Sequence, residues 1–232
     1  FRIDPLKSNS KNGQYGIPPN NPFASDDDQS TLAEIYAYGT RNPQNFAWDS
    51  KNGNMFVTDI GQNIVEEISL VTSGANLGWN LWEGSFAFIS RTEVSTERPR
   101  SNPTMTYPIA EYDQQDQLLQ RQAAAIGLVV YRDTAIPQLS NRILFGDLPS
   151  GEIFHLDADN LPDGGQDALR RVLFNDEGEV KTLLQLIQAK NRKQGKNPAT
   201  RADLRFGRGP EGKLFILNKQ DGTIRLLESL QK

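Results

Sequence analysis

The sequence predicts an all-β protein built as a β-propeller, and three observations support this prediction. The chain contains 19 Gly and 13 Pro, a content typical of a protein with many turns. Short runs rich in Val, Ile and Phe alternate with Gly, Asn, Asp and Pro, as expected for short strands. One strand–turn–strand pattern occurs three times, at intervals of 88 and 71 residues (Met55 to Ile143 to Leu214), and each interval would hold about two blades of ~40–50 residues or one blade with a long insertion. A sandwich of two sheets is the alternative, but repeats of this size favour the propeller.

The repeated pattern begins with a turn, continues as an apolar strand and ends on a short polar residue. Its three copies span residues 52–60, 140–148 and 211–219. The polar residues that end them are Asp59, Asp147 and Asn218. A second strand pattern follows each copy, at residues 66–71, 151–156 and 222–227. We therefore expect three other residues to occupy equivalent strands: Met55, Ile143 and Leu214.

The N-terminal residues 1–5, Phe-Arg-Ile-Asp-Pro, are similar to residues 153–157, Ile-Phe-His-Leu-Asp, which close the second repeat. We therefore expect the chain to begin within a blade, so that residues 1–232 are the later blades of a propeller. A partial ring exposes strand edges, so the missing N-terminal blades or a second chain would have to complete it.

Two insertions interrupt the repeats. Residues 86–105 are polar and contain Arg and Pro, which predicts a long surface loop. Residues 177–191 predict an amphipathic helix, because their apolar residues have helical spacing. These apolar residues are Val180, Leu183, Leu184 and Ile187.

Composition excludes several classes of protein. The net charge is −4 and the basic residues are scattered, so no nucleic-acid surface is indicated. No apolar run reaches the about 18 residues that a membrane span requires. The chain has no Cys, which excludes disulfides and thiol catalysis and fits a bacterial periplasm or a cytosol.

Four stretches within residues 15–84 carry a resemblance to a known family: YGIPPNNPF, EIYAYGTRNPQNFAWD, VTDIGQNIVEEISLV and GANLGWNLWEG. Together with ILFGDLPSGEIFHL and PEGKLFILNKQDGTIRLL, they resemble the soluble glucose/sorbosone dehydrogenases. That resemblance implies a six-bladed propeller, of which this chain is the C-terminal part. It also implies hydride transfer from a sugar or other polyol to pyrroloquinoline quinone (PQQ), a calcium requirement, and a bacterial periplasmic or secreted location.

The resemblance also implies the site residues. Arg41 and Asn42 would contact PQQ, because a guanidinium pairs with carboxylates and quinone oxygens, and an amide donates to a carbonyl. From the residues alone, a solvated Arg and a turn-forming Asn are the alternative. Calcium would be bound by the main-chain carbonyls of Gly61 and Gln62, and Glu67 would join a structural calcium site. Glu67 follows Glu66 in one strand, so only one of the two is expected to face a metal.

The chain also departs from the family pattern. The family's general base is a His in an upstream segment, whereas the single His here, His155, lies in a closing strand and is expected to be structural. Ile60 replaces a Gln before the calcium loop, and Pro149 stands near the place of a cofactor-binding Lys. Residues 201–210 keep charged residues in a different spacing: Arg201, Asp203, Arg205 and Arg208. These departures leave a second function open, a non-catalytic propeller that binds a glycan or a protein.

Overall fold

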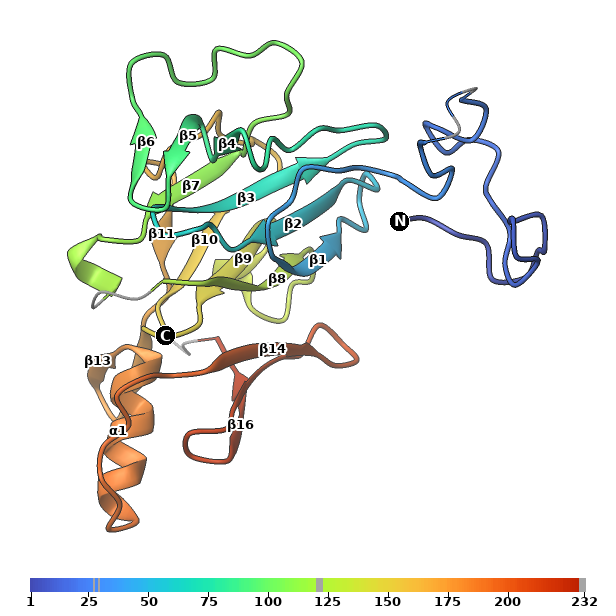
Figure 1. Cartoon of the computed structure of the whole chain (residues 1–232). Helices are drawn as coiled ribbons and strands as arrows, with labels where there is room; N and C mark the ends of the chain where they lie inside the picture. The colour runs from blue at the N-terminus through green and yellow to red at the C-terminus, as the bar shows by residue number, and fades with distance from the viewer. Residues whose placement is uncertain (27, 29, 120–122, 230–232) are drawn as a thin grey trace.

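The computed structural model describes residues 1–26, 28, 30–119 and 123–229 (Figure 1). Three antiparallel sheets follow one another along the chain. The first has the order β1-β2-β3-β7 and contains Pro43–Trp48, Met55–Asp59, Val65–Val71 and Ala110–Asp113. The second has the order β8-β9-β10-β11 and contains Ala125–Tyr131, Arg142–Asp147, Ile153–Asp157 and Arg170–Arg171. The third has the order β14-β15-β16 and contains Leu204–Arg208, Leu214–Asn218 and Thr223–Leu227.

The remaining elements are small and lie within or between these sheets in the sequence. A three-stranded sheet consists of β4 (Trp82–Glu83), β5 (Phe86–Ser90) and β6 (Glu93–Ser95). A hairpin consists of β12 (Phe174–Asp176) and β13 (Glu179–Lys181) and precedes the helix α1 (Leu183–Lys193). Two 3₁₀ turns span Gln117–Leu119 and Pro137–Leu139. None of the helices in the described part of the chain could cross a membrane.

The predicted repeat is confirmed by the strand order. Met55, Ile143 and Leu214 lie in β2, β9 and β15, and each of these is the second strand of its sheet. The described residues contain no closed sheet, so the six-bladed ring stays a prediction.

The first strands of the three sheets lie side by side, with β8 between β1 and β14. Asn45 Oδ1 accepts a hydrogen bond from the Gly127 N–H at 2.7 Å, so β1 and β8 meet there. Gly127 also packs against Phe206 of β14, so closely that a Cβ at Gly127 would come within 2.6 Å of that ring. Further along, the Tyr131 hydroxyl donates to the Gly212 carbonyl at 2.8 Å. Arg132, directly after β8, bonds to Asp49, directly after β1. For both pairs of strands the contacts advance together along the chain, so the three strands run in the same direction.

This alignment places the ends of the three sheets at two common rims. The site rim, as we call it, contains the segments that enter the first strands and the loops between second and third strands: residues 41–42, 60–64, 123–124, 148–152, 201–203 and 219–222. The opposite rim contains the turns between first and second strands, residues 49–54, 132–141 and 209–213. Figure 1 shows β3 and β2 of the first sheet at the top, β10, β9 and β8 of the second sheet below them, and β14 and β16 of the third sheet at the bottom.

Apolar side chains fill the space between neighbouring sheets. The largest cluster joins the first and second sheets, and its aromatic centre comprises Tyr112, Phe145 and Phe154. The third sheet and α1 pack on the second sheet through another cluster, which includes Ile153, Leu183, Leu204 and Ile216.

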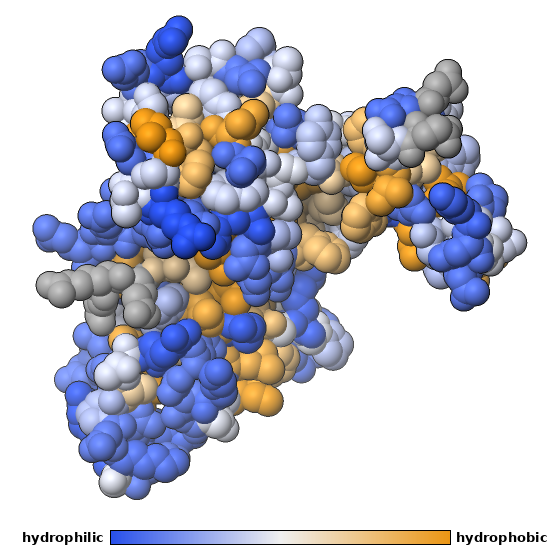
Figure 2. All heavy atoms as spheres, in the orientation of Figure 1, coloured by the Kyte–Doolittle hydropathy of each residue, from blue (hydrophilic) through white to orange (hydrophobic). Residues whose placement is uncertain are grey.

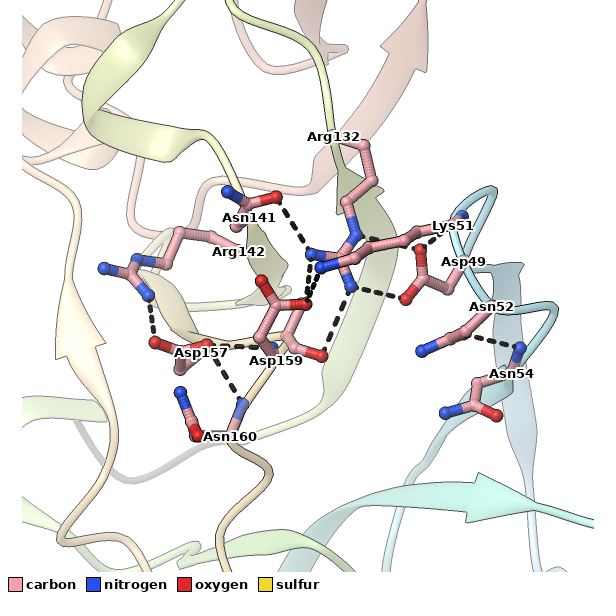
Figure 3. Close-up of polar contacts among 11 residues, drawn as sticks. Asp49, Lys51, Asn52, Asn54, Arg132, Asn141, Arg142, Asp157, Asp159 and Asn160 are labelled. Atoms are coloured by element: carbon pink, nitrogen blue, oxygen red, sulfur yellow. Dashed lines mark hydrogen bonds and ion pairs between the residues drawn. The ribbon is translucent and has the colours of Figure 1, made fainter.

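An ion-pair cluster at the opposite rim adds polar contacts between the first two sheets (Figure 3). Arg132 is bonded through Nε and Nη2 to the two carboxylate oxygens of Asp49, at 2.8 and 2.5 Å. Its Nη1 donates to Asn141 and Asp159, at 2.9 and 2.8 Å. Lys51 also pairs with Asp159 at 2.9 Å.

Residues 1–5 do not form the closing strand that the sequence predicted. Asp4 makes an isolated bridge with Gly16, and the Arg2 N–H donates to the Glu34 carbonyl at 2.8 Å. Phe1 is 87% exposed. Pro5 has no N–H to continue a ladder, and the polar loop that follows satisfies the backbone instead. In Figure 1 the N-terminal segment projects away from the sheets.

The two insertions differ in detail from the prediction. Residues 86–95 form β5 and β6 rather than a loop, because the apolar run at residues 86–89 pairs with residues 93–95 as a hairpin. The helix starts at Leu183, not near residue 177, because the Thr182 hydroxyl caps it and the Gln185 side chain bonds back to the Thr182 N–H. Val180 therefore lies in β13 and is 68% exposed.

Candidate functional site

A buried carboxylate fixes the Arg41-Asn42 segment at the site rim. Asp59, the last residue of β2, accepts hydrogen bonds from the N–H groups of Arg41 and Asn42 at 2.7 and 2.6 Å. Burial raises the pKa of Asp59, and these two bonds oppose the increase. Pro43 follows and restricts Asn42 to extended conformations. The backbone that carries Arg41 is therefore held from both sides.

In the other two sheets the residue that ends the second strand also makes a hydrogen bond to the segment before the first strand, which explains the repeated short polar residue. Asp147 accepts the Ala124 N–H at 2.7 Å. The Asn218 side-chain amide donates to the Ala202 carbonyl. In each sheet, the residue that ends the second strand thus holds the segment that enters the first strand.

The Arg41 side chain extends over the loop after β2. Its Nη1 donates to the carbonyls of Ile60 and Gly61 at 3.0 and 2.7 Å, and its Nε donates to Gln62 Oε1 at 3.0 Å. The guanidinium carbon also lies 5.9 Å from the centre of the Trp79 ring. The structure thus brings Arg41, a predicted PQQ contact, beside Gly61 and Gln62, the predicted calcium ligands.

Asn42 lies at the same rim with an exposed side chain. Its Oδ1 accepts a hydrogen bond from the Gln44 side-chain amide at 2.8 Å, and its main-chain carbonyl accepts the Ile60 N–H at 3.2 Å. The segment Arg41-Asn42 and the loop from Ile60 to Gln62 are thus one structural unit.

Glu83 organises that loop, and sequence reasoning missed this residue. Its Oε1 accepts four main-chain N–H groups, from Gln62, Asn63, Ile64 and Val65, at 2.9–3.2 Å. Gly61 is required in the loop, because a Cβ there would lie 1.7 Å from the Val65 carbonyl oxygen. The only available signal for Glu83 was its place in the family-like stretch GANLGWNLWEG.

Glu67 lies in a buried acidic row. Across the first sheet, Asp59, Glu67 and Glu111 are direct cross-strand neighbours, and all three are buried. Burial is the main cause that raises the pKa of Glu67, followed by the nearby charges of Asp59 and Glu111. Glu67 Oε2 and Glu83 Oε2 are buried and have no hydrogen-bond partner within the described residues.

The second sheet provides an internal comparison for Glu67. Glu152 has the equivalent place, because it lies opposite Asp147 as Glu67 lies opposite Asp59. Arg171 pairs with both carboxylate oxygens of Glu152 at 2.9 Å. Within the described residues, Glu67 has no such salt bridge.

Acidic groups alone do not make a metal site here. In the described ranges, no three His, Asp or Glu side chains converge closely enough to hold an ion. A cation near Glu67 would therefore need main-chain carbonyls to complete its shell.

Glu66 faces the other side of the sheet, as expected for adjacent strand residues. Its two carboxylate oxygens accept hydrogen bonds from the Ala125 N–H at 2.6 Å and from the Gln114 side-chain amide at 2.5 Å. Burial raises the pKa of Glu66 to about 8. Glu66 therefore joins the first two sheets.

A basic cavity lies at the same rim in the third sheet. It has a volume of about 410 Å³ and is lined by residues that include Arg201, Asp203, Arg205 and Lys219. Arg201 Nε bonds to Asp203 at 2.6 Å, and Lys219 Nζ lies 3.5 Å from the same carboxylate.

The structure also shows where the other residues that depart from the family pattern lie. Arg208 lies outside the cavity, where it pairs with Asp133 at 3.2 Å. Pro149 offers only its carbonyl, which accepts the Ala202 N–H at 2.8 Å. His155 lies in the middle of β10, opposite Leu144, where burial lowers its pKa. Its place within the strand keeps it away from the site rim.

The fold and the rim together define an all-β repeat protein with a cationic site at one end of its sheets. The chain matches the family model for glucose / sorbosone dehydrogenase over residues 10–196. It therefore belongs to that family.

Two differently named relatives are similar to this chain over part of its length. The HIPL2 protein of Arabidopsis thaliana is 33% identical over 138 residues, which are 59% of this chain and 19% of that protein. Aldose sugar dehydrogenase YliI of Escherichia coli is 25% identical over 142 residues, which are 60% of this chain and 35% of that protein.

The solved structures support the propeller fold. A glucose dehydrogenase superposes with a TM-score of 0.60 at 19% identity, covering 96% of this chain and 53% of that chain. The PQQ-bound form of aldose sugar dehydrogenase from Streptomyces coelicolor superposes with a TM-score of 0.53 at 17% identity, covering 91% of this chain and 48% of that chain. The chain thus spans about half the length of the solved structures that it matches.

Proposed function

We propose that the site rim binds PQQ in a sugar dehydrogenase, and that hydride passes there from the C–OH carbon of a sugar or other polyol. The observation that supports this proposal best is the Arg41 guanidinium held beside the Gly61-Gln62 loop. PQQ would supply the electron-accepting orthoquinone. The family assignment does not favour the alternative of a non-catalytic propeller.

The residues at the rim suit an anionic quinone. PQQ carries three carboxylates, and Arg41 offers a planar set of N–H donors that matches a carboxylate or two adjacent quinone oxygens. Asn42 is exposed beside it and can donate to a quinone oxygen. The cavity lined by Arg201, Arg205 and Lys219 adds positive charge at the same rim. Pro149 contributes no charge, so binding depends more heavily on these arginines.

Arg41 would bind and orient the quinone and stabilise negative charge on its oxygens as hydride arrives. The substrate hydroxyl must also lose a proton to a general base. His155 is too far inside the second sheet to serve, so we propose that the base comes from polypeptide outside residues 1–232. Arg41 and Asn42 are accordingly cofactor contacts, and no catalytic base is assigned within this chain.

Calcium is the second proposed cofactor. Glu67 is a candidate ligand because its buried Oε2 has no hydrogen-bond partner in the described residues, whereas the equivalent Glu152 has Arg171. A divalent cation would neutralise Glu67 as Arg171 neutralises Glu152. Separately, the carbonyls of Gly61 and Gln62 are candidate ligands for a calcium ion that accompanies PQQ, because main-chain oxygens suit a hard cation.

The two end sheets support the proposal that further blades or a second chain pack on this one. Phe46 and Trp48 of β1 are 61% and 57% exposed, and Ile224 and Leu226 of β16 are 68% and 43% exposed. Apolar surface is visible near β14 and β16 in Figure 2. β16 also lacks a partner on its outer edge within the described residues. A bacterial periplasmic or secreted location fits a protein without Cys and remains part of the proposal.

A PQQ titration of the full-length protein, followed by absorbance, tests this function directly. We expect saturable binding with one PQQ per chain in the presence of calcium. Reduction of the bound quinone by aldoses, added one at a time, would then identify the substrate. A protein that binds no PQQ at millimolar calcium would contradict the proposed function.

A further inference from the structure

The contact between Arg41 and the Ile60–Gln62 loop occupies an oxygen that the proposed calcium site needs. Arg41 Nη1 donates to the Ile60 and Gly61 carbonyls, and Nε donates to Gln62 Oε1; we call these three bonds the Arg41 latch. We propose that the latch and a divalent cation exclude each other, so that cation binding releases Arg41. This inference rests on the proposed function.

The competition follows from the geometry at Gly61. The Gly61 oxygen lies 2.7 Å from the guanidinium Nη1. A calcium ion bound to the same oxygen, at about 2.3–2.6 Å, would face the positive guanidinium across a single atom. Arg41 and Gln62 are only partly exposed, so water screens the repulsion between the two cations incompletely. The two positive groups therefore compete for the Gly61 oxygen.

The surrounding backbone cannot relieve this conflict by moving. Asp59 holds the N–H groups of Arg41 and Asn42, and Glu83 holds the loop through four main-chain N–H groups that include those of Gln62 and Val65. The carbonyls are therefore fixed, and the Arg41 side chain is the part that can rotate. Trp79 already lies 5.9 Å from the guanidinium, so a flat surface is available to the released side chain.

Release of Arg41 should strengthen the binding of the anionic PQQ. While latched, two of its three nitrogens are bonded to the loop, so the guanidinium cannot present its full donor set to a carboxylate. Once a cation takes the Gly61 oxygen, Arg41 is free to pair with PQQ. The cation and the anion should then strengthen each other's binding, because such coupling is reciprocal.

Terbium luminescence sensitised by Trp79 tests the latch without PQQ. The signal lost in the Trp79→Phe variant reports this site, and calcium competition gives the calcium affinity. We expect Arg41→Ala to bind both ions at least about tenfold more tightly, because a competing charge-assisted hydrogen bond is removed. The matched control is Arg142→Ala, which removes an arginine paired with Asp157 at the opposite rim, and it should leave the affinity unchanged.

Two conditions make the result decisive. Titrations repeated in about 1 M salt, where the Debye length is about 3 Å, separate local competition from long-range repulsion, and the gain in Arg41→Ala should persist there. Circular dichroism must show that each variant folds. Equal ion affinity in wild type and Arg41→Ala, or a gain that salt abolishes, would overturn the latch.

The PQQ titration separates this inference from the proposed function. If PQQ never binds but Arg41→Ala still gains ion affinity, the latch stands and the quinone proposal fails. If PQQ binds and Arg41→Ala has the same ion affinity as wild type, the latch fails and the quinone proposal stands.

Discussion

Asp49 and Arg132 form a two-point ion pair that joins the first sheet to the second. Nε and Nη2 of Arg132 lie 2.8 and 2.5 Å from the two oxygens of Asp49, and the Asp49 side chain is fully buried. The pair lies at the rim opposite the Arg41 site. It fixes the relative position of the two sheets that carry the site.

Replacing Arg132 should destabilise the protein strongly. Arg132→Ala leaves Asp49 buried without its partner, and a broken buried pair costs about 3–5 kcal/mol. Arg142→Ala is the control, because the Arg142–Asp157 pair is partly exposed and such pairs contribute about 0–1 kcal/mol. Urea unfolding of both variants measures the difference. Equal losses in the two would show that the Arg132 cluster is no stronger than a surface pair.

The same pair predicts a pH dependence. The hydrogen bonds from Arg132 hold the pKa of Asp49 below its ordinary value of 3.8, although burial opposes them. A lowered pKa contributes stability above the unfolded value of 3.8, and this contribution is lost as the pH falls through the folded value. Asp49→Asn should therefore lose less stability than wild type between pH 5 and acid, as measured by urea unfolding at each pH. If the free energies of unfolding of wild type and Asp49→Asn changed in parallel with pH, Asp49 would not be the source of the pH dependence.

The sequence predicted the features that depend on local periodicity and chain order. The three repeats correctly predicted the second strand of each sheet, because turn residues and apolar strands are local signals in the sequence. The resemblance implied Arg41 and Gly61 as site residues, and the antiparallel pairing of β1 with β2 brings these two segments together. Glu66 and Glu67 were placed on opposite faces because strand side chains alternate.

Features that depend on distant contacts were not predictable. Glu83 follows the loop that it holds by about twenty residues, and no pattern marks a carboxylate that will accept four N–H groups. The acidic row requires the register of β2, β3 and β7, which sequence does not reveal. The prediction of an N-terminal strand was wrong, because the similarity of residues 1–5 to residues 153–157 did not show whether a partner strand was available.

Calcium should stabilise the protein through Glu67. A ligand at about one hundred times its dissociation constant adds about 2.7 kcal/mol to the free energy of unfolding. We expect this gain in wild type and its loss in Glu67→Gln, measured by urea unfolding with calcium or with a chelator. Glu152→Gln is the control: it breaks the pair with Arg171 but should keep the calcium effect. A calcium gain that survives Glu67→Gln would exclude Glu67 as a ligand.

The last prediction concerns the contribution of Arg41 to PQQ binding. Arg41→Ala should weaken PQQ binding by about tenfold or more, because a charge-assisted contact contributes roughly 1.5–3 kcal/mol. Arg41→Lys should restore little of this loss, since an ammonium has no planar fork for a carboxylate or two quinone oxygens. Absorbance titration at saturating calcium measures both variants and removes the latch from the comparison, because the cation then holds the Gly61 oxygen in each protein. Arg142→Ala, at the opposite rim, should bind PQQ as wild type does. Unchanged affinity in Arg41→Ala would show that Arg41 serves only to hold the Ile60–Gln62 loop, and full rescue by lysine would reduce its role to that of a point charge.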